Sequence, residues 1–113
     1  VTQVRTRSFS QDPSKALVTG AELMLGSKYP YGQRDKYGNS HEGGANIQYG
    51  RFMDELGYEF FEEAHRRQDM IRFGVFTTKK WFSHTSSAPH KTLFPIPQVE
   101  INKNSKLNQN SGY

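Results

Sequence analysis

The sequence contains no cysteine. This absence excludes a disulfide framework and thiolate zinc sites, but it does not fix the compartment, because many exported proteins also lack cysteine. No apolar run approaches the roughly 20 residues of a membrane-spanning helix. The chain also lacks an initial methionine and a signal peptide. It starts at Val1 in a charged run that is typical of the end of a helix, so we expect a fragment of a longer chain.

Apolar residues are few. Leu, Ile, Val and Phe make up about a fifth of the 113 residues, which is close to the level below which disorder is expected. Disordered chains combine few apolar residues with a high net charge. The net charge here is +4, which is modest. We therefore expect one domain at most, with a thin core, packed against something larger.

Four segments can be separated along the chain, namely 1–9, 10–44, 45–73 and 74–113. The first segment, residues 1–9, is typical of the end of a helix. In the second, apolar residues recur at helical spacing after Pro13 and predict a marginal helix over 13–25. Glycine and tyrosine then dominate residues 29–44, which predicts a long irregular loop. A loop of this length is either functional or disordered.

The third segment carries the clearest helical period. Its apolar stripe consists of Tyr49, Phe52, Met53, Leu56, Phe60 and Ala64. Glu62 precedes Arg66 by four residues, and Glu63 precedes Arg67 by four, which is the favourable order for ion pairs along a helix. The pattern predicts one long amphipathic helix over 45–73.

The fourth segment has no helical period. Two prolines in the stretch Phe94–Pro97 favour extended backbone, because proline fixes φ and biases the residue before it away from the helical region. Val99 and Ile101 alternate with polar residues. We expect a loop followed by an extended C-terminal tail over 74–113.

Enzymatic and metal-binding motifs are poorly represented. Glu62, His65 and Asp69 have a spacing that could hold a metal on a helix. The adjacent Arg66 and Arg67 would repel a cation, so a hydrogen-bonded surface cluster is the preferred interpretation. We expect no enzyme, no metal and no cofactor.

The sequence pI of 9.4 is compatible with nucleic-acid binding. The Lys and Arg residues are scattered along the chain, however, and no known nucleic-acid module is present. The sequence therefore does not favour a nucleic-acid partner.

The aromatic residues point to a different ligand. Tyr29, Tyr31 and Tyr37 lie in the polar loop, and Trp81 follows two lysines. Exposed aromatic rings beside hydroxyl and amide groups can stack on the apolar faces of sugar rings. The alternative is that these rings anchor their loops to the body of the protein.

Three stretches, in order, resemble the C-terminal end of the RagB/SusD family. They are EEAHRRQDMIRFG at 62–74, FPIPQVEI at 94–101 and LNQNSGY at 107–113. The opening VTQVRTR also resembles a helix end in that family. Leu56 after Glu55 replaces an arginine of the pattern, which puts one ion pair of the family in doubt. Ala64 replaces a glycine and Ser111 a proline; we expect both to be mild, since a helix prefers alanine to glycine.

The resemblance implies a mainly α fold, with this chain as the C-terminal portion of a helical, tetratricopeptide-like SusD domain. It implies a non-catalytic outer-membrane lipoprotein, facing outward and anchored through an N-terminal cysteine that this chain lacks. The implied partners are glycans or other nutrient oligomers, a SusC-like TonB-dependent transporter, and the upstream part of the same polypeptide.

The resemblance also implies roles for particular residues. Those expected to be structural are Arg66, Arg67, Asp69, Arg72, Pro95 and Pro97. The aromatic residues lie outside the matching motifs, and that they contact ligand or transporter is a separate hypothesis; they are Trp81, Tyr29, Tyr31 and Tyr37. Two alternatives stay open, a small helical protein-interaction module and, less favoured, a basic nucleic-acid-binding domain.

Overall fold

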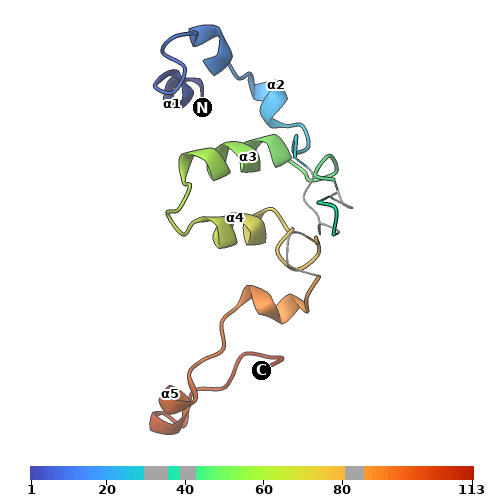
Figure 1. Cartoon of the computed structure of the whole chain (residues 1–113). Coiled ribbons are helices and arrows are strands. Elements are labelled where there is room, and N and C mark those ends of the chain that lie inside the picture. The colour runs from blue at the N-terminus through green and yellow to red at the C-terminus, as the bar shows by residue number, and fades with distance from the viewer. Residues whose placement is uncertain (30–35, 39–42, 81–85) are drawn as a thin grey trace.

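The computed structural model describes residues 1–29, 36–38, 43–80 and 86–113. Its elements are α1 (Thr2–Thr6), η1 (Pro13–Ala16), α2 (Gly20–Leu23), α3 (Gly50–Glu59), α4 (Arg66–Arg72), η2 (Pro89–Thr92) and α5 (Gln98–Lys103), where η marks a 3₁₀-helix. Across these described ranges the regular structure is entirely helical, as Figure 1 shows. The expectation of a mainly helical chain is confirmed.

The centre of the molecule is the antiparallel hairpin of α3 and α4, which lie side by side (Figure 1). The prediction of one helix over 45–73 is wrong, because α3 ends at Glu59 and α4 begins at Arg66. Between them Glu62 and Ala64 have φ values of 63° and 60°. These left-handed backbone conformations interrupt the helical hydrogen bonds and reverse the chain direction. Ala64 therefore lies in the turn and not in a helix. The expectation that alanine in place of the family's glycine is mild, because a helix prefers alanine, does not apply at this position.

Packing explains why the chain folds back. The core consists of Ile47, Met53, Met70 and Val75, with Phe73 and Phe76 packed against it. On one straight helix Met53 and Met70 would be separated by about 25 Å, at 1.5 Å per residue. The hairpin instead buries both side chains in one cluster, and burying a methionine stabilises a fold by about 1.5–3 kcal/mol.

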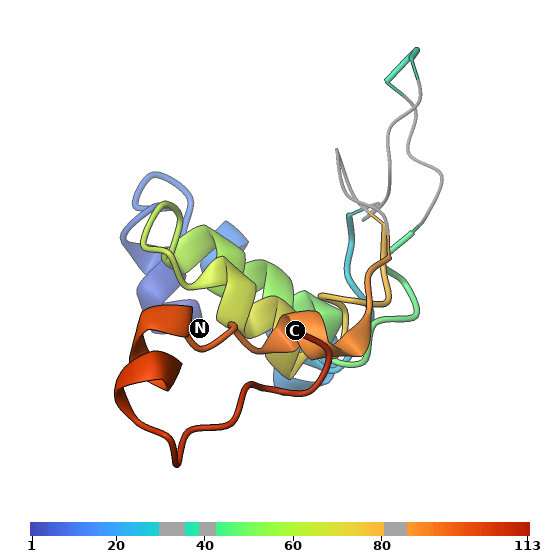
Figure 2. The ribbon, with the colours of Figure 1, turned by 90° about the horizontal axis from the view of Figure 1, so that it is seen from below.

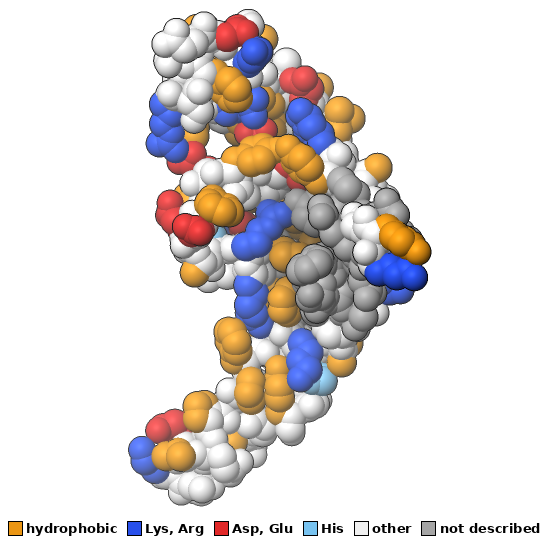
Figure 3. Space-filling model, viewed as in Figure 1, with side chains coloured by type: hydrophobic (Ala, Val, Ile, Leu, Met, Phe, Trp, Pro, Cys, Tyr) orange, Lys and Arg blue, Asp and Glu red, His pale blue; other side chains and the backbone are white. Residues whose placement is uncertain are grey.

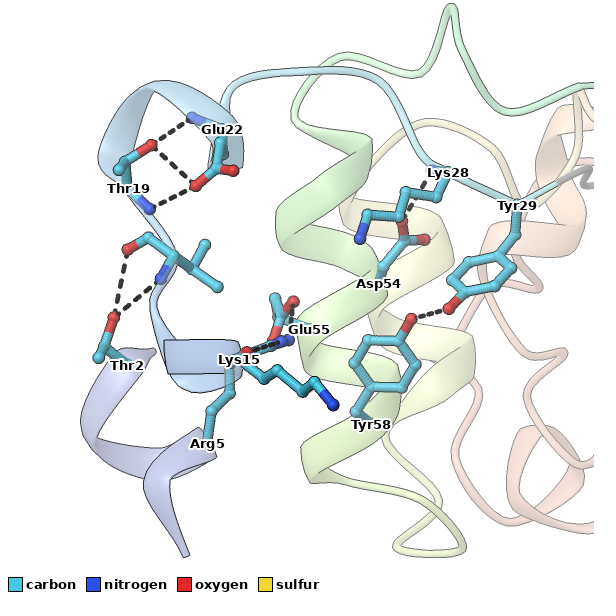
Figure 4. Close-up of polar contacts among 11 residues, drawn as sticks. Thr2, Arg5, Lys15, Thr19, Glu22, Lys28, Tyr29, Asp54, Glu55 and Tyr58 are labelled. Atoms are coloured by element: carbon cyan, nitrogen blue, oxygen red, sulfur yellow. Dashed lines mark hydrogen bonds and ion pairs between the residues drawn. The ribbon is translucent and has the colours of Figure 1, made fainter. Parts of the chain in front are cut away.

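The N-terminal elements contact α3 through charged groups. Arg5 Nη1 donates to both carboxylate oxygens of Glu55, at 2.8 and 3.1 Å, and its Nη2 donates to the Lys15 carbonyl at 2.9 Å (Figure 4). Glu55, which lacks the neighbouring arginine of the family pattern, thus pairs with an arginine 50 residues earlier. Arg7 and Glu59 form a second ion pair between α1 and α3.

The predicted helix over 13–25 is divided in two. Leu17 is extended, with ψ of 126°, and separates η1 from α2. Thr19 then starts α2 with a capping box, in which its hydroxyl accepts from the Glu22 backbone N–H while the Glu22 carboxylate accepts from the Thr19 N–H. This side-chain cap favours a new helix start over continuation of the first turn.

Two glycines allow the chain to cross the start of α3. A Cβ atom on Gly50 would lie 2.2 Å from the Ser27 nitrogen, and one on Gly26 would lie 1.8 Å from the Ala45 carbonyl oxygen. These approaches place Ser27 and the residues after it against α3, and so position the site described below.

The C-terminal segment is only partly extended. Residues 98–103 form α5, which corrects the prediction of an extended tail over its whole length. Pro97, with ψ of 132°, supplies the N-cap backbone, Glu100 lies in the first turn and Lys103 in the last, and these two pair at 3.2 Å. This charge order suits the helix dipole.

The end of the chain folds back onto the extended residues that precede α5. The Gln109 side chain accepts from the Ile96 N–H and donates to the Ile96 carbonyl, both at 2.8 Å. Asn110 Nδ2 donates to the Phe94 carbonyl at 2.7 Å, and the Tyr113 hydroxyl donates to the Leu93 carbonyl at 2.8 Å. Residues 93–113 therefore form a closed loop, which we call the tail loop.

The molecule is elongated. Its radius of gyration is 18.3 Å and its extents are 59 × 34 × 24 Å, whereas a compact domain of about 100 residues has a radius near 13 Å. Figures 1 and 2 show the tail loop leading away from the hairpin. The small core and the long axis agree with the expectation of a thin core.

Candidate functional site

A cavity of about 720 Å³ lies beside the turn between α3 and α4. Its aromatic lining consists of Tyr29, Tyr58, Phe60 and Phe61. Its charged lining consists of Asp54, Glu62, Arg66 and Asp69. A second cavity of about 660 Å³ lies between α1 and α3, and Tyr29 and Tyr58 line both. Leu56 and Phe60 also line both cavities, so these two residues and the tyrosine pair separate the two hollows.

Tyr29 and Tyr58 meet edge to face, with ring centroids 6.1 Å apart and planes at 84°. Their hydroxyl groups are hydrogen-bonded to each other, as Figure 4 shows. Partial burial, together with this hydrogen bond, raises the pKa of the Tyr58 hydroxyl well above its usual 10.0. The Tyr58 hydroxyl therefore stays protonated at physiological pH, and a tyrosine hydroxyl can both donate and accept a hydrogen bond.

The backbone beneath Tyr29 is held by the buried carboxylate of Asp54. Ser27 Oγ donates to Asp54 Oδ1 at 2.6 Å, and the Lys28 backbone N–H donates to Oδ2 at 3.0 Å (Figure 4). The Tyr29 N–H in turn donates to Ser27 Oγ at 3.1 Å. Both Asp54 oxygens therefore have protein partners, and Asp54 holds the backbone that carries Tyr29.

Asp69 differs from Asp54 in its hydrogen bonding. It is 4% exposed, and its Oδ1 lies 3.5 Å from Arg72 Nη1, a long contact. Its Oδ2 is buried and has no hydrogen-bond partner among the residues that the structure describes. Arg66, on the same cavity wall, donates from Nη1 to the Met53 carbonyl at 2.9 Å. The cavity therefore contains one buried acceptor that is not saturated.

Arg67 joins α4 to the C-terminal segment. Its Nη2 donates to the Lys91 and Thr92 carbonyls at 2.9 and 3.2 Å. Its guanidinium carbon lies 4.9 Å from the Phe76 ring centre and 4.1 Å from that of Phe94. This geometry combines cation–π contact with backbone hydrogen bonds, and lysine could not reproduce it.

The sequence-predicted ligand residues are not brought together in the described part of the chain. Tyr29 lines both cavities. Tyr37 is 77% exposed, lies apart from the two cavities, and has the Lys36 ammonium 4.9 Å from its ring centre. Tyr31 and Trp81 lie outside the described residues.

Tyr58 is a site residue that sequence reasoning missed. The sequence does indicate this role, because Tyr58 lies off the apolar stripe of its helix. In the structure its side chain is 52% exposed. An aromatic residue on the polar face of an amphipathic helix is a better ligand candidate than one on the stripe, which faces the core.

The residues predicted as structural are distributed over three places. Arg66 and Asp69 line the cavity, Arg67 contacts the C-terminal segment, and Arg72 is largely exposed. Pro95 and Pro97 flank Ile96, whose backbone groups are bonded to Gln109. Their structural role stays a prediction.

The described residues have mixed surface charge and no cluster of metal-ligating side chains. On the face in Figure 3, basic side chains extend from one end to the other and are interspersed with acidic and apolar ones. Within the described ranges, no three His, Asp or Glu side chains gather as a metal site. The helices in these ranges are too short and too polar to cross a bilayer.

Comparison with known proteins gives one relative of stated function. The chain is 41% identical, over an alignment of 69 residues, to the starch-binding protein SusD of Bacteroides thetaiotaomicron. The alignment covers 54% of this chain and 12% of the relative. No family model matches the chain, and no solved structure matches it. The relative's name is that of a binding protein and not of an enzyme, in agreement with the sequence-based expectation. The chain is therefore homologous to part of SusD, and its resemblance to the RagB/SusD family is confirmed over those 69 residues.

Proposed function

We propose that the chain belongs to a non-catalytic surface protein that binds glycans or other nutrient oligomers. In this proposal the protein delivers them to a SusC-like TonB-dependent transporter from the outer face of the outer membrane, where a lipid anchor holds it. The observation that carries the proposal is the 41% identity to a protein named for starch binding. Because the alignment covers 12% of that relative, the ligand, transporter, location and anchor are all part of the proposal.

The chemistry of the cavity supports a carbohydrate ligand. Aromatic rings that are partly exposed stand beside hydroxyl and carboxylate groups. Rings of this kind cover the C–H faces of a sugar, while the polar groups bond its hydroxyls. Tyr29 keeps its predicted ligand role in this proposal, and Tyr31, Tyr37 and Trp81 keep theirs as candidates.

The proposal is tested by isothermal titration of the purified chain with maltoheptaose, at 50 mM and at 200 mM salt. Binding should be observed and should change little with salt, because stacking on a neutral sugar releases no counterions. A nucleic-acid ligand would bind orders of magnitude more weakly at the higher salt. Incubation should release no new reducing ends. No measurable affinity for maltoheptaose would contradict glycan binding, and release of reducing ends would contradict the non-catalytic role.

A second candidate, a helical protein-interaction module, is favoured by the exposed apolar side chains. After Tyr37, the most exposed in the described part of the chain are Phe61, Phe94, Leu17 and Met24. Stable association with a SusC-like transporter in co-purification, without any affinity for maltoheptaose, would favour this function over glycan binding.

A further inference from the structure

We propose that the cavity beside the α3–α4 turn is a subsite for one neutral pyranose ring of an oligosaccharide. In this subsite Asp69 accepts a hydrogen bond from a sugar hydroxyl, and Tyr58 and Phe61 contact the ring. The inference rests on the proposed function and gives it a location, because glycan binding by itself does not say which residues are involved.

The first step is the unsatisfied acceptor. A buried carboxylate oxygen without a donor is costly, since the group has lost its water without gaining a hydrogen bond. Asp69 Oδ2 is such an atom among the described residues, and Asp69 lines the cavity. Because Oδ2 itself is buried, a hydroxyl group in the cavity supplies the missing donor once the Asp69 carboxylate turns toward it. Asp54 cannot take this role as well, because Ser27 and Lys28 already occupy its two oxygens.

The second step is the aromatic rim. Phe61 lines the cavity and is 75% exposed. Tyr58 lies half-exposed on the same cavity, with its hydroxyl held by Tyr29. These rings offer exposed apolar contact area, while the Asp69 side chain is buried. A pyranose has the matching pattern, with apolar C–H groups on its faces and hydroxyls around its edge.

The third step is charge. Three carboxylates line the cavity, on Asp54, Glu62 and Asp69, against one guanidinium, on Arg66. An excess of negative charge in a partly enclosed space repels an acidic ligand. The cavity therefore favours a neutral sugar over a uronic acid or a sulfated sugar. Its volume of about 720 Å³ is in the range of small-molecule pockets.

The experiment compares two cavity variants with two matched controls in titrations with maltoheptaose. Asp69→Asn keeps the shape of the side chain and removes its charge, and Phe61→Ala removes a ring that is mostly exposed. We expect each to weaken binding by about tenfold or more. Asp69→Asn replaces a hydrogen bond to a charged group by a weaker neutral one, and Phe61→Ala removes the aromatic contact area. Asp12→Asn and Phe94→Ala make comparable changes outside both cavities, the second removing a ring that is 70% exposed, and both should bind like the wild type.

The outcomes separate this inference from the proposed function. Unchanged affinity in both cavity variants, with binding by the wild type, overturns the subsite and leaves the function standing. A loss confined to Phe61→Ala removes Asp69 from the subsite and overturns the inference as stated. No binding by the wild type overturns the proposed function itself. Circular dichroism of each variant checks that it folds, and Phe61→Ala keeps the test decisive if Asp69→Asn does not.

Discussion

Ala64 carries a backbone conformation that alanine adopts only at a cost. Its φ of 60° places it in the left-handed region, where a Cβ atom approaches the following carbonyl oxygen and costs roughly 1–2 kcal/mol. Glycine has no such contact, but it loses about 0.4–1 kcal/mol through the entropy of the unfolded chain. Ala64→Gly should therefore raise the free energy of unfolding by about 0.5–1 kcal/mol, as measured by urea denaturation of the 113-residue chain.

The matched control is Ala21→Gly. Ala21 lies inside α2, where glycine costs about 0.5–1 kcal/mol relative to alanine. The two substitutions should thus have opposite signs. If Ala64→Gly lowers the stability as Ala21→Gly does, the left-handed conformation at Ala64 is not the dominant one.

Some features of the site can be predicted from neighbouring residues in the sequence, and others depend on the folded arrangement. Tyr58 has one, because its place off the apolar stripe can be read from the spacing of its neighbours. The burial of Asp69 has none, since it depends on how α4 packs against α3. The pairing of Arg5 with Glu55 joins residues 50 positions apart, and such a contact follows only from the folded arrangement.

At the scale of elements, the capping box makes α2 sensitive to pH. Hydrogen bonds from the Thr19 backbone N–H and hydroxyl lower the pKa of the Glu22 carboxyl below its usual 4.5. A lowered pKa means that the folded form binds the proton more weakly than the unfolded form. The cap therefore stabilises α2 fully above pH 4.5, and this contribution is lost as the pH falls through the lower folded pKa.

Carbon-13 NMR of the Glu22 carboxyl between pH 2 and pH 7 measures this directly. Its midpoint should lie below 4.5, and Thr19→Val, which removes the hydroxyl, should raise it part of the way back. A midpoint at or above 4.5 in the wild type would contradict the capping box.

The helical character of residues 45–73 could be predicted from sequence, but the division of this segment into α3 and α4 could not. The apolar stripe is real, and both halves of it contribute to the core. The turn after Glu59 contains no proline or glycine up to Arg66, so no usual helix-ending residue marks it. What decides the outcome is the contact of Met53 with the Met70 region, a tertiary effect that overrides local propensity. Conversely, α5 follows Pro97, which predicts extended backbone from sequence, although proline is also compatible with a helix start.

At the scale of the whole molecule, Arg67 joins the hairpin to the C-terminal segment. Its guanidinium contacts two aromatic rings and two carbonyl groups at once. Arg67→Lys keeps the charge but removes the planar fork. We expect residues 88–113 to lose hydrogen-exchange protection by about tenfold while α3 and α4 keep theirs, and the radius of gyration from X-ray scattering to rise above 18.3 Å.

Arg72→Lys is the control, because the Arg72 side chain is mostly exposed and makes one long contact. It should leave both measurements unchanged. Equal protection of residues 88–113 in the wild type and in Arg67→Lys would show that other contacts hold the segment in place.

The pairing of Gln109 with Ile96 has a consequence for self-association. Extended backbone with free N–H and carbonyl groups is a template on which a strand of another molecule can grow, and fibrils begin in this way. Around Ile96 that template is blocked, because the two neighbouring prolines have no N–H to offer and a side-chain amide already occupies both backbone groups of Ile96. This stretch, in which Leu93 and Phe94 are exposed, is in this way protected from intermolecular β-pairing.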